Sequence, residues 1–340
     1  MQPLQKEVET PKSTEPLMKV TGLKKYFPIT SQFGRTIGNV QAIENLNFEL
    51  YEGKTLGLVG ESGCGKSTTG RALLRLTDPT EGTAFYKGRD IFSLSDKEFN
   101  KIRREMQMVF QDPHSSLNPK KRIGEIIEEP MNIHNIGTKH DRMERSMNIL
   151  QKTGIRKDQY FRYPHEFSGG QRQRIGLARA LALNPKIVVL DEPVSALDVS
   201  IQSQVINLLQ EIQDEFSLAY LFISHDLSVV RHIADEIGVM YLGHIVEKAP
   251  TDELFANPLH PYTQALLSSI PLPDPKAKRE RIILKGDVPS PINPPSGCVF
   301  HTRCPYVMEH CKTQIPQTTI QGPGHEVACH LYDKKSKEMF

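Results

Sequence analysis

Residues 60–67 read Gly-Glu-Ser-Gly-Cys-Gly-Lys-Ser, an uninterrupted match to the phosphate-loop pattern G-x-x-x-x-G-K-[ST]. An apolar run at residues 55–59 precedes the match and predicts a strand, and residues 68–76 follow it with the composition of a helix. This context directs backbone N–H groups and a helix N-terminus at one anion. Lys66 can reach the β- and γ-phosphates of a nucleotide, and the Ser67 hydroxyl can hold Mg²⁺. The stretch therefore predicts an α/β nucleotide-binding domain; a glycine-rich turn that binds no nucleotide is the weaker alternative.

The composition is that of an ordinary globular protein. The chain has 340 residues, of which 38% are hydrophobic and 24% charged, and it is long enough for two or three domains. Its net charge of +2 argues neither for nor against nucleic acid as a partner. No apolar run approaches the roughly 18 residues of a membrane span, and residues 1–17 lack the apolar segment of a secretory signal. We therefore expect a cytosolic protein that can still dock on a membrane protein.

Further apolar runs predict the rest of the sheet and its helices. The first of them alternates in the manner of a half-buried strand, and the later ones are continuous, as in buried parallel strands. Strands are expected at residues 40–50, 106–110, 187–190, 221–223 and 237–241. Helical periodicity covers residues of roughly 120 to 165, and another helix is expected over residues 171–183.

The organisation along the chain suggests a tail, a main domain and a C-terminal region. We expect a flexible tail at residues 1–17 and a nucleotide-binding domain over residues 18–257, with a helical subdomain at about residues 112–180. Prolines cluster after residue 257 on both sides of a basic patch at residues 276–281. That composition predicts a linker or an extended wrap rather than a core. Residues 258–340 end in a small module rich in cysteine and histidine.

Two carboxylates follow the expected strand at residues 187–190. Asp191 and Glu192 would lie at the carboxyl end of a parallel strand, which is the edge where ligands bind in α/β sheets. Asp191 suits a Mg²⁺ role, usually through water, and Glu192 suits a base for the attacking water. If no other motif accompanied these two carboxylates, an exposed acidic turn after a strand would be the ordinary alternative. Together with the phosphate loop, the pair completes one phosphoryl-transfer site.

Five further features between residues 26 and 225, which follow the family's order along the chain, resemble those of ATP-binding-cassette ATPases. Residues 167–171, Phe-Ser-Gly-Gly-Gln, resemble the family signature, with Phe where Leu is commoner. Gln111 matches the Q-loop, residues 195–198 the D-loop and His225 the switch histidine, while Tyr26 is placed like the aromatic that stacks on adenine. The resemblance implies a RecA-like core with an antiparallel β subdomain, an α-helical signature subdomain and a small Cys-rich C-terminal extension. It also implies that the signature acts on the ATP of a partner subunit.

The resemblance implies a role for each matching residue. The implied catalytic residues are Lys66, Gln111, Glu192 and His225, and the implied Mg²⁺ ligands are Ser67, Gln111 and Asp191. The implied ATP contacts are Tyr26, Gly60, Glu61, Ser62, Gly63, Cys64, Gly65, Lys66, Ser67, Thr68, Gln111, Ser168, Gly169, Gly170, Gln171 and Asp191. Physical chemistry agrees for the signature, whose hydroxyl, N–H groups and following helix can face a γ-phosphate. For Tyr26, packing beside Phe27 is the ordinary alternative.

Other stretches narrow the resemblance to bacterial oligopeptide and dipeptide permeases, closest to the F-like ATPase branch. These stretches are residues 110–113 (Phe-Gln-Asp-Pro), 115–119, 260–267 and 286–291. The resemblance covers residues of roughly 18 to 332. It implies ATP hydrolysis that drives peptide import at the cytoplasmic face of the membrane. The implied partners are a second, D-like ATPase, two permease subunits that dock near residues 112–140, and an external peptide-binding protein.

Four cysteines near the C-terminus form a second chemical feature: Cys298, Cys304, Cys311 and Cys329. Four thiolates can surround a metal ion or an iron–sulfur cluster. Their spacing lacks the paired C-x₂-C of structural zinc sites, and Pro305 follows Cys304 as proline follows a ligating cysteine in ferredoxins. The resemblance implies a [4Fe–4S] cluster with a structural or redox-sensing role. Zinc and unliganded thiols remain alternatives, with four histidines nearby as substitute zinc ligands: His301, His310, His325 and His330.

The main rival function is a soluble cassette ATPase that acts on nucleic acid or ribosomes, with the cysteines as a zinc element. Such proteins usually carry two cassettes or a large inserted arm, whereas this chain has one set of motifs. It also lacks a dense basic stripe with interleaved aromatics, so no nucleic-acid partner is expected. A third candidate function is a regulatory scaffold that binds nucleotide without hydrolysing it. The presence of Glu192, which suits a base for the attacking water, argues against it.

Overall fold

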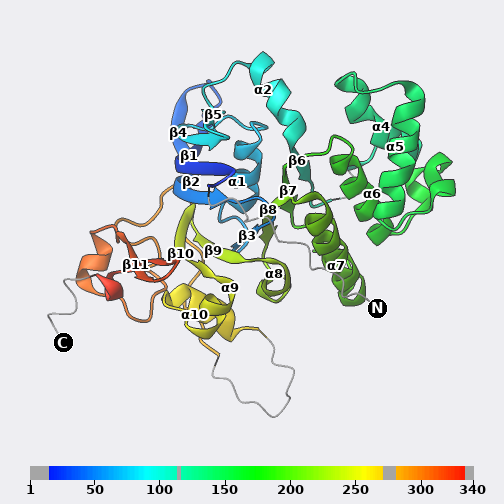
Figure 1. The fold of residues 1–340 in the computed structure, drawn as a ribbon. Helices are drawn as coiled ribbons and strands as arrows, with labels where there is room; N and C mark the ends of the chain where they lie inside the picture. Colours follow the sequence, from blue (N-terminus) through cyan, green and yellow to red (C-terminus); the bar gives the residue numbers. More distant parts are fainter. Residues whose placement is uncertain (1–14, 113–115, 271–280, 334–340) are drawn as a thin grey trace, which may run out of the picture.

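Two β-sheets organise the computed structural model, which describes residues 15–112, 116–270 and 281–333 (Figure 1). The smaller sheet is antiparallel and has the strand order β2-β1-β4-β5. Its strands are β1 (Met18–Thr30), β2 (Thr36–Leu50), β4 (Glu81–Tyr86) and β5 (Arg89–Asp90). The strand expected at residues 40–50 is thus confirmed, although it begins earlier, at Thr36. Most of the predicted tail lies outside the described residues.

The larger sheet has the order β11-β12-β10-β9-β3-β8-β7-β6, and its centre is parallel. The parallel strands are β6 (Met106–Val109), β7 (Ile187–Asp191), β8 (Ala219–Ser224), β3 (Thr55–Val59) and β9 (Glu236–Tyr241). Every residue of β3, β7 and β8 is buried, as continuous apolar runs predict for strands covered on both faces. All five of these strands were predicted from the sequence.

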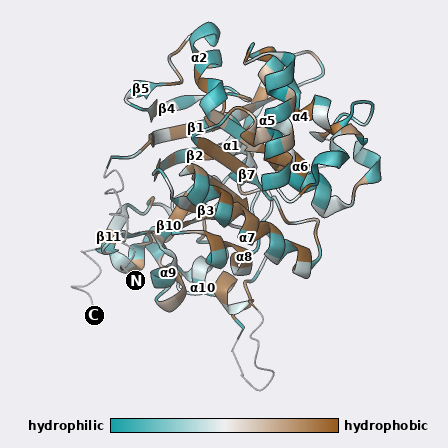
Figure 2. Cartoon of the chain, turned by 45° about the vertical axis from the view of Figure 1, so that its right-hand side comes forward, coloured by the Kyte–Doolittle hydropathy of each residue, from teal (hydrophilic) through white to brown (hydrophobic). Residues whose placement is uncertain are grey.

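Helices flank this sheet and, beyond β6, form a separate group (Figure 1). That group contains α4 (Ile123–Ile133), α5 (Lys139–Lys152) and α6 (Gly169–Leu181), which confirms the predicted helical stretch. The remaining helices before β9 are α1 (Lys66–Leu73), α2 (Asp96–Ile102), α7 (Val199–Phe216) and α8 (Leu227–Ile233). Short 3₁₀ turns lie at Arg103–Glu105, Lys157–Phe161, Pro164–Glu166, Glu309–Lys312 and His330–Tyr332. Figure 2 shows hydrophobic colour along the central strands and hydrophilic colour on α2.

The C-terminal region extends the larger sheet instead of wrapping loosely around it. Strand β10 (His244–Pro250) pairs antiparallel with β9, β12 (His325–Ala328) pairs with β10, and β11 (Thr318–Gly322) pairs with β12. Two helices, α9 (Thr251–Ala256) and α10 (Pro261–Ser268), follow β10.

The expectation of a linker without a core was therefore wrong for this region. Tyr262, Leu267 and Phe300 are buried and belong to the same hydrophobic cluster as the central strands. Pro261 does not break structure because it occupies the first turn of α10, where no N–H donor is needed. Most of the basic patch, residues 276–280, lies outside the described residues.

None of the helices in the described ranges is both long and apolar enough to cross a membrane.

Candidate nucleotide site

The phosphate loop joins β3 to α1, and two of its glycines are required by close backbone contacts. Gly60 and Gly65 have φ angles of 153° and 106°. A Cβ at Gly60 would lie 2.1 Å from the Met240 carbonyl oxygen, and one at Gly65 would lie 2.1 Å from that of Ala42. The loop therefore packs directly against β9 and β2, where only glycine fits.

Lys66 begins α1 and is almost fully buried. Its Nζ donates to the carbonyl oxygens of Gly60, at 2.7 Å, and Glu61, at 3.0 Å. Cys64 lies beneath the loop, where burial raises the pKa of its thiol and the charge of Lys66 opposes that rise. The ammonium of Lys66 is thus held at the inner side of the loop.

A pocket of about 640 Å³ lies over the phosphate loop, a volume within the usual range for small-molecule sites. Gln111 follows β6, Glu192 follows β7 and His225 follows β8, so their strands bring all three to the same carboxyl edge. The lining residues are Val40, Ala42, Gly60, Glu61, Ser62, Gly63, Gly65, Lys66, Ser67, Thr68, Gln111, Glu192, His225, Leu266 and Pro291.

Ser67 lines this pocket and contacts Asp191, which is buried and does not itself line the pocket. The Ser67 hydroxyl donates to Oδ1 of Asp191 across 2.7 Å. Asp191 is buried, which raises the pKa of its carboxyl, while Ser67, Arg71 and Lys66 act in the opposite direction. A hydroxyl beside one carboxylate is a donor set for Mg²⁺, which takes its other ligands from water and phosphates.

Glu192 occupies the centre of a three-residue arrangement. Its Oε2 accepts a hydrogen bond from Nε2 of Gln111 at 2.8 Å, and its Oε1 lies 3.2 Å from Nδ1 of His225. Its backbone has a φ of 46°, a left-handed conformation that costs roughly 1–3 kcal/mol and is found mostly at functional sites. Held from both sides, the carboxylate can accept a proton from a water in the pocket.

The signature residues lie away from the phosphate loop of the same chain. Ser168 caps α6: its Oγ accepts the Gln171 N–H at 3.4 Å, and Gln171 Oε1 accepts the Ser168 N–H at 3.0 Å. A Cβ at Gly170 would lie 2.7 Å from the Ile201 side chain on α7. Residues 168–171 do not appear among the residues that line the pocket. One chain alone therefore does not bring its signature to its own phosphate loop.

Comparison with known proteins agrees with this geometry. Residues 43–195 match the model of the ABC transporter family, and residues 246–311 match that of the oligopeptide/dipeptide transporter C-terminal region. The oligopeptide transport ATP-binding protein AppF of Bacillus subtilis is 58% identical over 95% of this chain and 99% of its own length. This chain belongs to the ABC transporter family. It is an ATPase of the oligopeptide and dipeptide transport type, as the sequence predicts.

Other matches support the same assignment. The dipeptide transport ATP-binding protein DppF of Haemophilus influenzae is 50% identical over 95% of this chain and 98% of its own length. Among solved structures, the ABC cassette MJ0796, dimeric and bound to ADP and Pi, has a TM-score of 0.61 at 28% identity. That match covers 69% of this chain and 98% of that one. The cassette fold expected from the sequence is thus confirmed.

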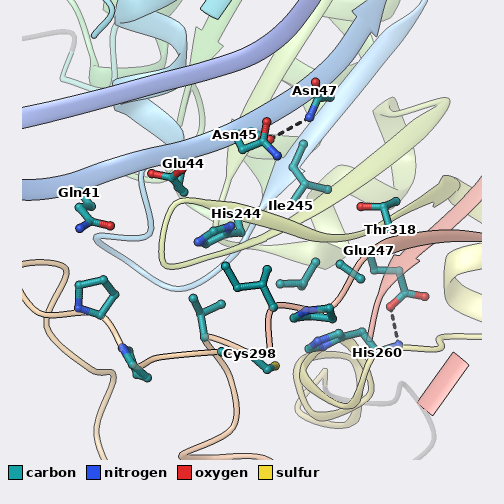
Figure 3. Close-up of a pocket in the computed structure, with 18 of the residues that line it drawn as sticks. Gln41, Glu44, Asn45, Asn47, His244, Ile245, Glu247, His260, Cys298 and Thr318 are labelled. Carbon is teal, nitrogen blue, oxygen red and sulfur yellow. Dashed lines mark hydrogen bonds between the residues drawn. The ribbon is translucent and has the colours of Figure 1, made fainter. Parts of the chain in front are cut away.

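Tyr26 of this ABC ATPase lines a different cavity, of about 460 Å³. Figure 3 shows this cavity, with Gln41 and Glu44 among its labelled residues. The hydroxyl of Tyr26 donates to Glu44, and its cross-strand partner Gln41 lines the same cavity. The next residue, Phe27, pairs with Val40, which lines the phosphate-loop pocket. Paired residues share a face of the sheet and successive residues alternate. Phe27, and not Tyr26, therefore lies on the face that the pocket occupies.

Two pocket residues from the C-terminal region of this ABC ATPase carried no nucleotide-site signal in the sequence, and neither did Val40 and Ala42 of β2. Leu266 comes from α10, and Pro291 follows in the C-terminal region. The carbonyl oxygen of Pro291 accepts the N–H of Gln41 at 2.9 Å, which fixes the segment against β2. The stretches around both residues carried the family resemblance, but only tertiary contacts place them beside the phosphate loop.

The four C-terminal cysteines gather in one place. Burial raises the pKa of Cys298 to about 11 and that of Cys329 to about 12, and the charges of neighbouring cysteines add to both shifts. The N–H of Cys298 donates to the Cys311 carbonyl oxygen at 2.8 Å. Burial also raises the pKa of Cys304, while the nearby backbone at Phe300, Tyr306 and Leu331 acts to lower the pKa of Cys298, Cys304 and Cys329 respectively.

A metal centre at these cysteines is not confirmed. In the part of the chain that the structure describes, no group of three or more His, Cys, Asp or Glu side chains could hold a metal ion. Two of the histidines considered as zinc ligands are hydrogen-bonded elsewhere. His325 contacts Glu247 at 2.8 Å, and His330 contacts Asp333 at 2.7 Å.

Proposed function

We propose that this chain binds ATP and Mg²⁺ in the phosphate-loop pocket and hydrolyses ATP to drive peptide uptake at the cytoplasmic face of a membrane. The observation that carries the proposal is the convergence of the phosphate loop, the Ser67–Asp191 pair and the bridged Glu192 on one pocket. The 58% identity to an oligopeptide transport ATP-binding protein supports the choice of substrate.

Each residue of the pocket has a role in this proposal. Lys66 and the loop N–H groups hold the β- and γ-phosphates, and Ser67 and Asp191 hold Mg²⁺, with Gln111 near the same metal. Glu192 takes the proton of the water that attacks the γ-phosphorus, while Gln111 and His225 orient its carboxylate. Hydrolysis then yields ADP and phosphate.

A second ATPase subunit would complete the site. Residues 168–171 do not line the phosphate-loop pocket of their own chain, which suits a signature that acts on the ATP of a partner. We infer a heteromer with a D-like ATPase, two permease subunits and an external peptide-binding protein. The helical group around α4 is the docking surface that we propose for a permease subunit, within residues of roughly 112 to 140. Ile133, at the end of α4, is 70% exposed there.

The domain boundaries also remain a proposal. We assign residues 18–257 to the nucleotide-binding domain, with a helical subdomain at about residues 112–180, and residues 258–340 to the C-terminal region. The separate helical group of α4, α5 and α6 supports the subdomain. Proteolysis at the expected boundaries would test the division.

Purification of the tagged chain from its native membranes tests the proposed function. We expect two permease subunits and a second ATPase to co-purify, and we expect addition of peptide and its binding protein to stimulate ATP hydrolysis in the reconstituted complex. Recovery of ribosomes or nucleic acid instead of membrane subunits would favour the rival soluble ATPase.

Phe27 gives a prediction that separates two adjacent aromatics. Stacking of a base on an aromatic ring contributes about 1–3 kcal/mol. Because Phe27 is 38% exposed, we expect Phe27→Ala to weaken ATP binding by about five- to tenfold, at the low end of that range. Tyr26→Ala removes the neighbouring ring together with the hydroxyl that donates to Glu44, and it should leave ATP affinity unchanged. Titration calorimetry with ATP measures both, and the reverse order of effects would restore Tyr26 as the stacking residue.

We propose further that the four cysteines hold a [4Fe–4S] cluster, with zinc as the alternative. The shared location of the four thiols, and nearby backbone groups that favour the charged form of three of them, suit thiolate ligands. A bound cluster would supply a rigid cross-link, or a redox-sensitive one, between the segments that carry the cysteines.

Metal analysis tests this proposal. Protein purified without oxygen should contain about four iron atoms per chain and absorb visible light, as expected for a [4Fe–4S] cluster. Cys329→Ser should remove most of both signals, whereas Cys64→Ser, a buried cysteine in the phosphate loop, should retain them. Zinc without iron would support the alternative, and protein free of both metals would exclude the cluster and the zinc site.

A further inference from the structure

Arg303 connects the C-terminal region to the phosphate loop. Its Nη1 donates to Oε2 of Glu61 at 2.7 Å, and its Nη2 donates to Oε1 of the same carboxylate at 3.2 Å. Such bidentate pairs are among the stronger polar contacts in proteins. The Arg303 side chain is only 8% exposed, whereas that of Glu61 is 30% exposed. The pair therefore joins a fixed cation to a carboxylate on the edge of the pocket.

Aromatic side chains fix the cation in place. Tyr241, Tyr262 and Phe300 form a buried cluster in which ring centroids are 4.8–5.5 Å apart. The guanidinium carbon of Arg303 lies 5.9 Å from the centroid of the Tyr241 ring. The backbone N–H of Arg303 donates to the Phe300 carbonyl oxygen. Its hydrogen bond to Glu61 raises the pKa of Arg303, so the group stays charged.

Glu61 is held by its backbone as well. Its N–H donates to the Tyr262 hydroxyl at 2.9 Å, and Tyr262 is fully buried in α10. The hydrogen bonds made by the Glu61 side chain to Arg303 and by its N–H to Tyr262 therefore both come from the C-terminal region, about 200 or more residues further along the chain.

An unpaired carboxylate at this position would oppose the binding of a polyphosphate. Glu61 lines the phosphate-loop pocket beside the glycines and Lys66, so its charge acts on any anion bound there. We propose that Arg303 is a positioning residue for ATP, which neutralises Glu61 and holds the phosphate loop in its binding conformation. This inference rests on the proposed nucleotide binding at the loop.

The same contact makes the phosphate loop dependent on the cysteine module. Arg303 directly precedes Cys304 and lies five residues after Cys298. The N–H of Cys298 donates a hydrogen bond to the carbonyl oxygen of Cys311. A change that loosens these cysteines moves Arg303 relative to Glu61. The affinity for ATP should therefore fall when the segments that carry the four cysteines lose their fixed structure.

Calorimetric ATP titration of a set of variants tests the inference, together with steady-state kinetics. Arg303→Ala should weaken ATP binding roughly tenfold, which is less than the loss expected for truncating one partner of a fully buried charge pair, because Glu61 is partly exposed. The value of kcat at saturating ATP should stay within about twofold, since the reacting groups are unchanged. Arg303→Lys keeps the positive charge without the bidentate geometry, so it should lose less ATP affinity than Arg303→Ala. Glu61→Gln should bind ATP at least as tightly as the unaltered chain.

The double variant separates electrostatics from simple loss of structure. Glu61→Gln combined with Arg303→Ala should regain most of the affinity lost by Arg303→Ala alone, because no unpaired carboxylate remains. Lys312→Ala is the matched control: it breaks an exposed pair with Glu309 in the same region and should change nothing. Cys329→Ser should weaken ATP binding, and this effect should shrink when Glu61 is already Gln.

Two outcomes would overturn the inference. One is an Arg303→Ala variant that binds ATP as tightly as the unaltered chain, and the other is a double variant no better than Arg303→Ala. Failure of the proposed function looks different, because then the unaltered chain itself would not bind ATP. Circular dichroism of each variant identifies any that misfold. If Arg303→Ala misfolds, the milder changes Arg303→Lys and Glu61→Gln still show whether the Arg303–Glu61 pair sets the ATP affinity.

Discussion

Glu192→Gln is expected to abolish ATP turnover while the protein still binds ATP. The substitution keeps the size of the side chain and leaves one oxygen able to accept the hydrogen bond from Gln111, but it removes the group that takes the proton of water. General-base catalysis typically contributes 10²- to 10⁴-fold, so the rate of phosphate release should fall at least about a hundredfold. Phosphate release and ATP titration measure the two properties separately.

One control variant and one further variant of the site make this result specific. Glu215→Gln removes a carboxylate that pairs with Lys152 on the surface, far along the chain from the pocket, and should leave turnover unchanged. His225→Ala leaves Glu192 with only one of its two neighbours and should give an intermediate loss. Hydrolysis by Glu192→Gln at the normal rate would exclude Glu192 as the base.

Lys66→Ala is expected to cause the largest loss of ATP affinity. Loss of one partner of a buried, hydrogen-bonded charge contact costs about 2–5 kcal/mol, which corresponds to at least about thirtyfold in the dissociation constant. Equilibrium titration of ATP, with the Mg²⁺ concentration held constant, gives the value directly.

Thermal unfolding supplies the folding control for the lysine. Lys66 is buried and its Nζ contacts only two backbone carbonyls and the sulfur of Cys64 among the described residues, so its removal should not unfold the protein. Lys54→Ala, which breaks the partly exposed pair with Asp235 at the other end of β3, should bind ATP normally. Undiminished ATP binding by Lys66→Ala would contradict the proposed role of the loop.

The parts of the site that could be predicted all follow strands with strong apolar patterns. Gln111, Asp191, Glu192 and His225 each come at or just after the end of a buried parallel strand, and parallel strands end at one edge of a sheet. The apolar pattern of the strands therefore predicts that these side chains lie together. The phosphate loop was equally predictable, because its glycines and Lys66 form one short local motif.

The two adjacent aromatics show where such patterns fail. Side chains alternate between the faces of a strand, so a shift of one residue exchanges the faces. The pairing of β1 with β2 has a register shift between Lys25 and Tyr26. Composition does not predict that shift, and it decides which β2 residues lie beside Tyr26 and which lie beside Phe27.

The sequence by itself determined the cassette fold, the phosphate loop and the residues at the carboxyl edge of the sheet, because each depends on local pattern. Only the tertiary structure decided that the C-terminal region belongs to the core and that Arg303 and Tyr262 hold Glu61. Those contacts join residues about 200 or more positions apart, and they depend on burial and side-chain geometry that no local pattern encodes.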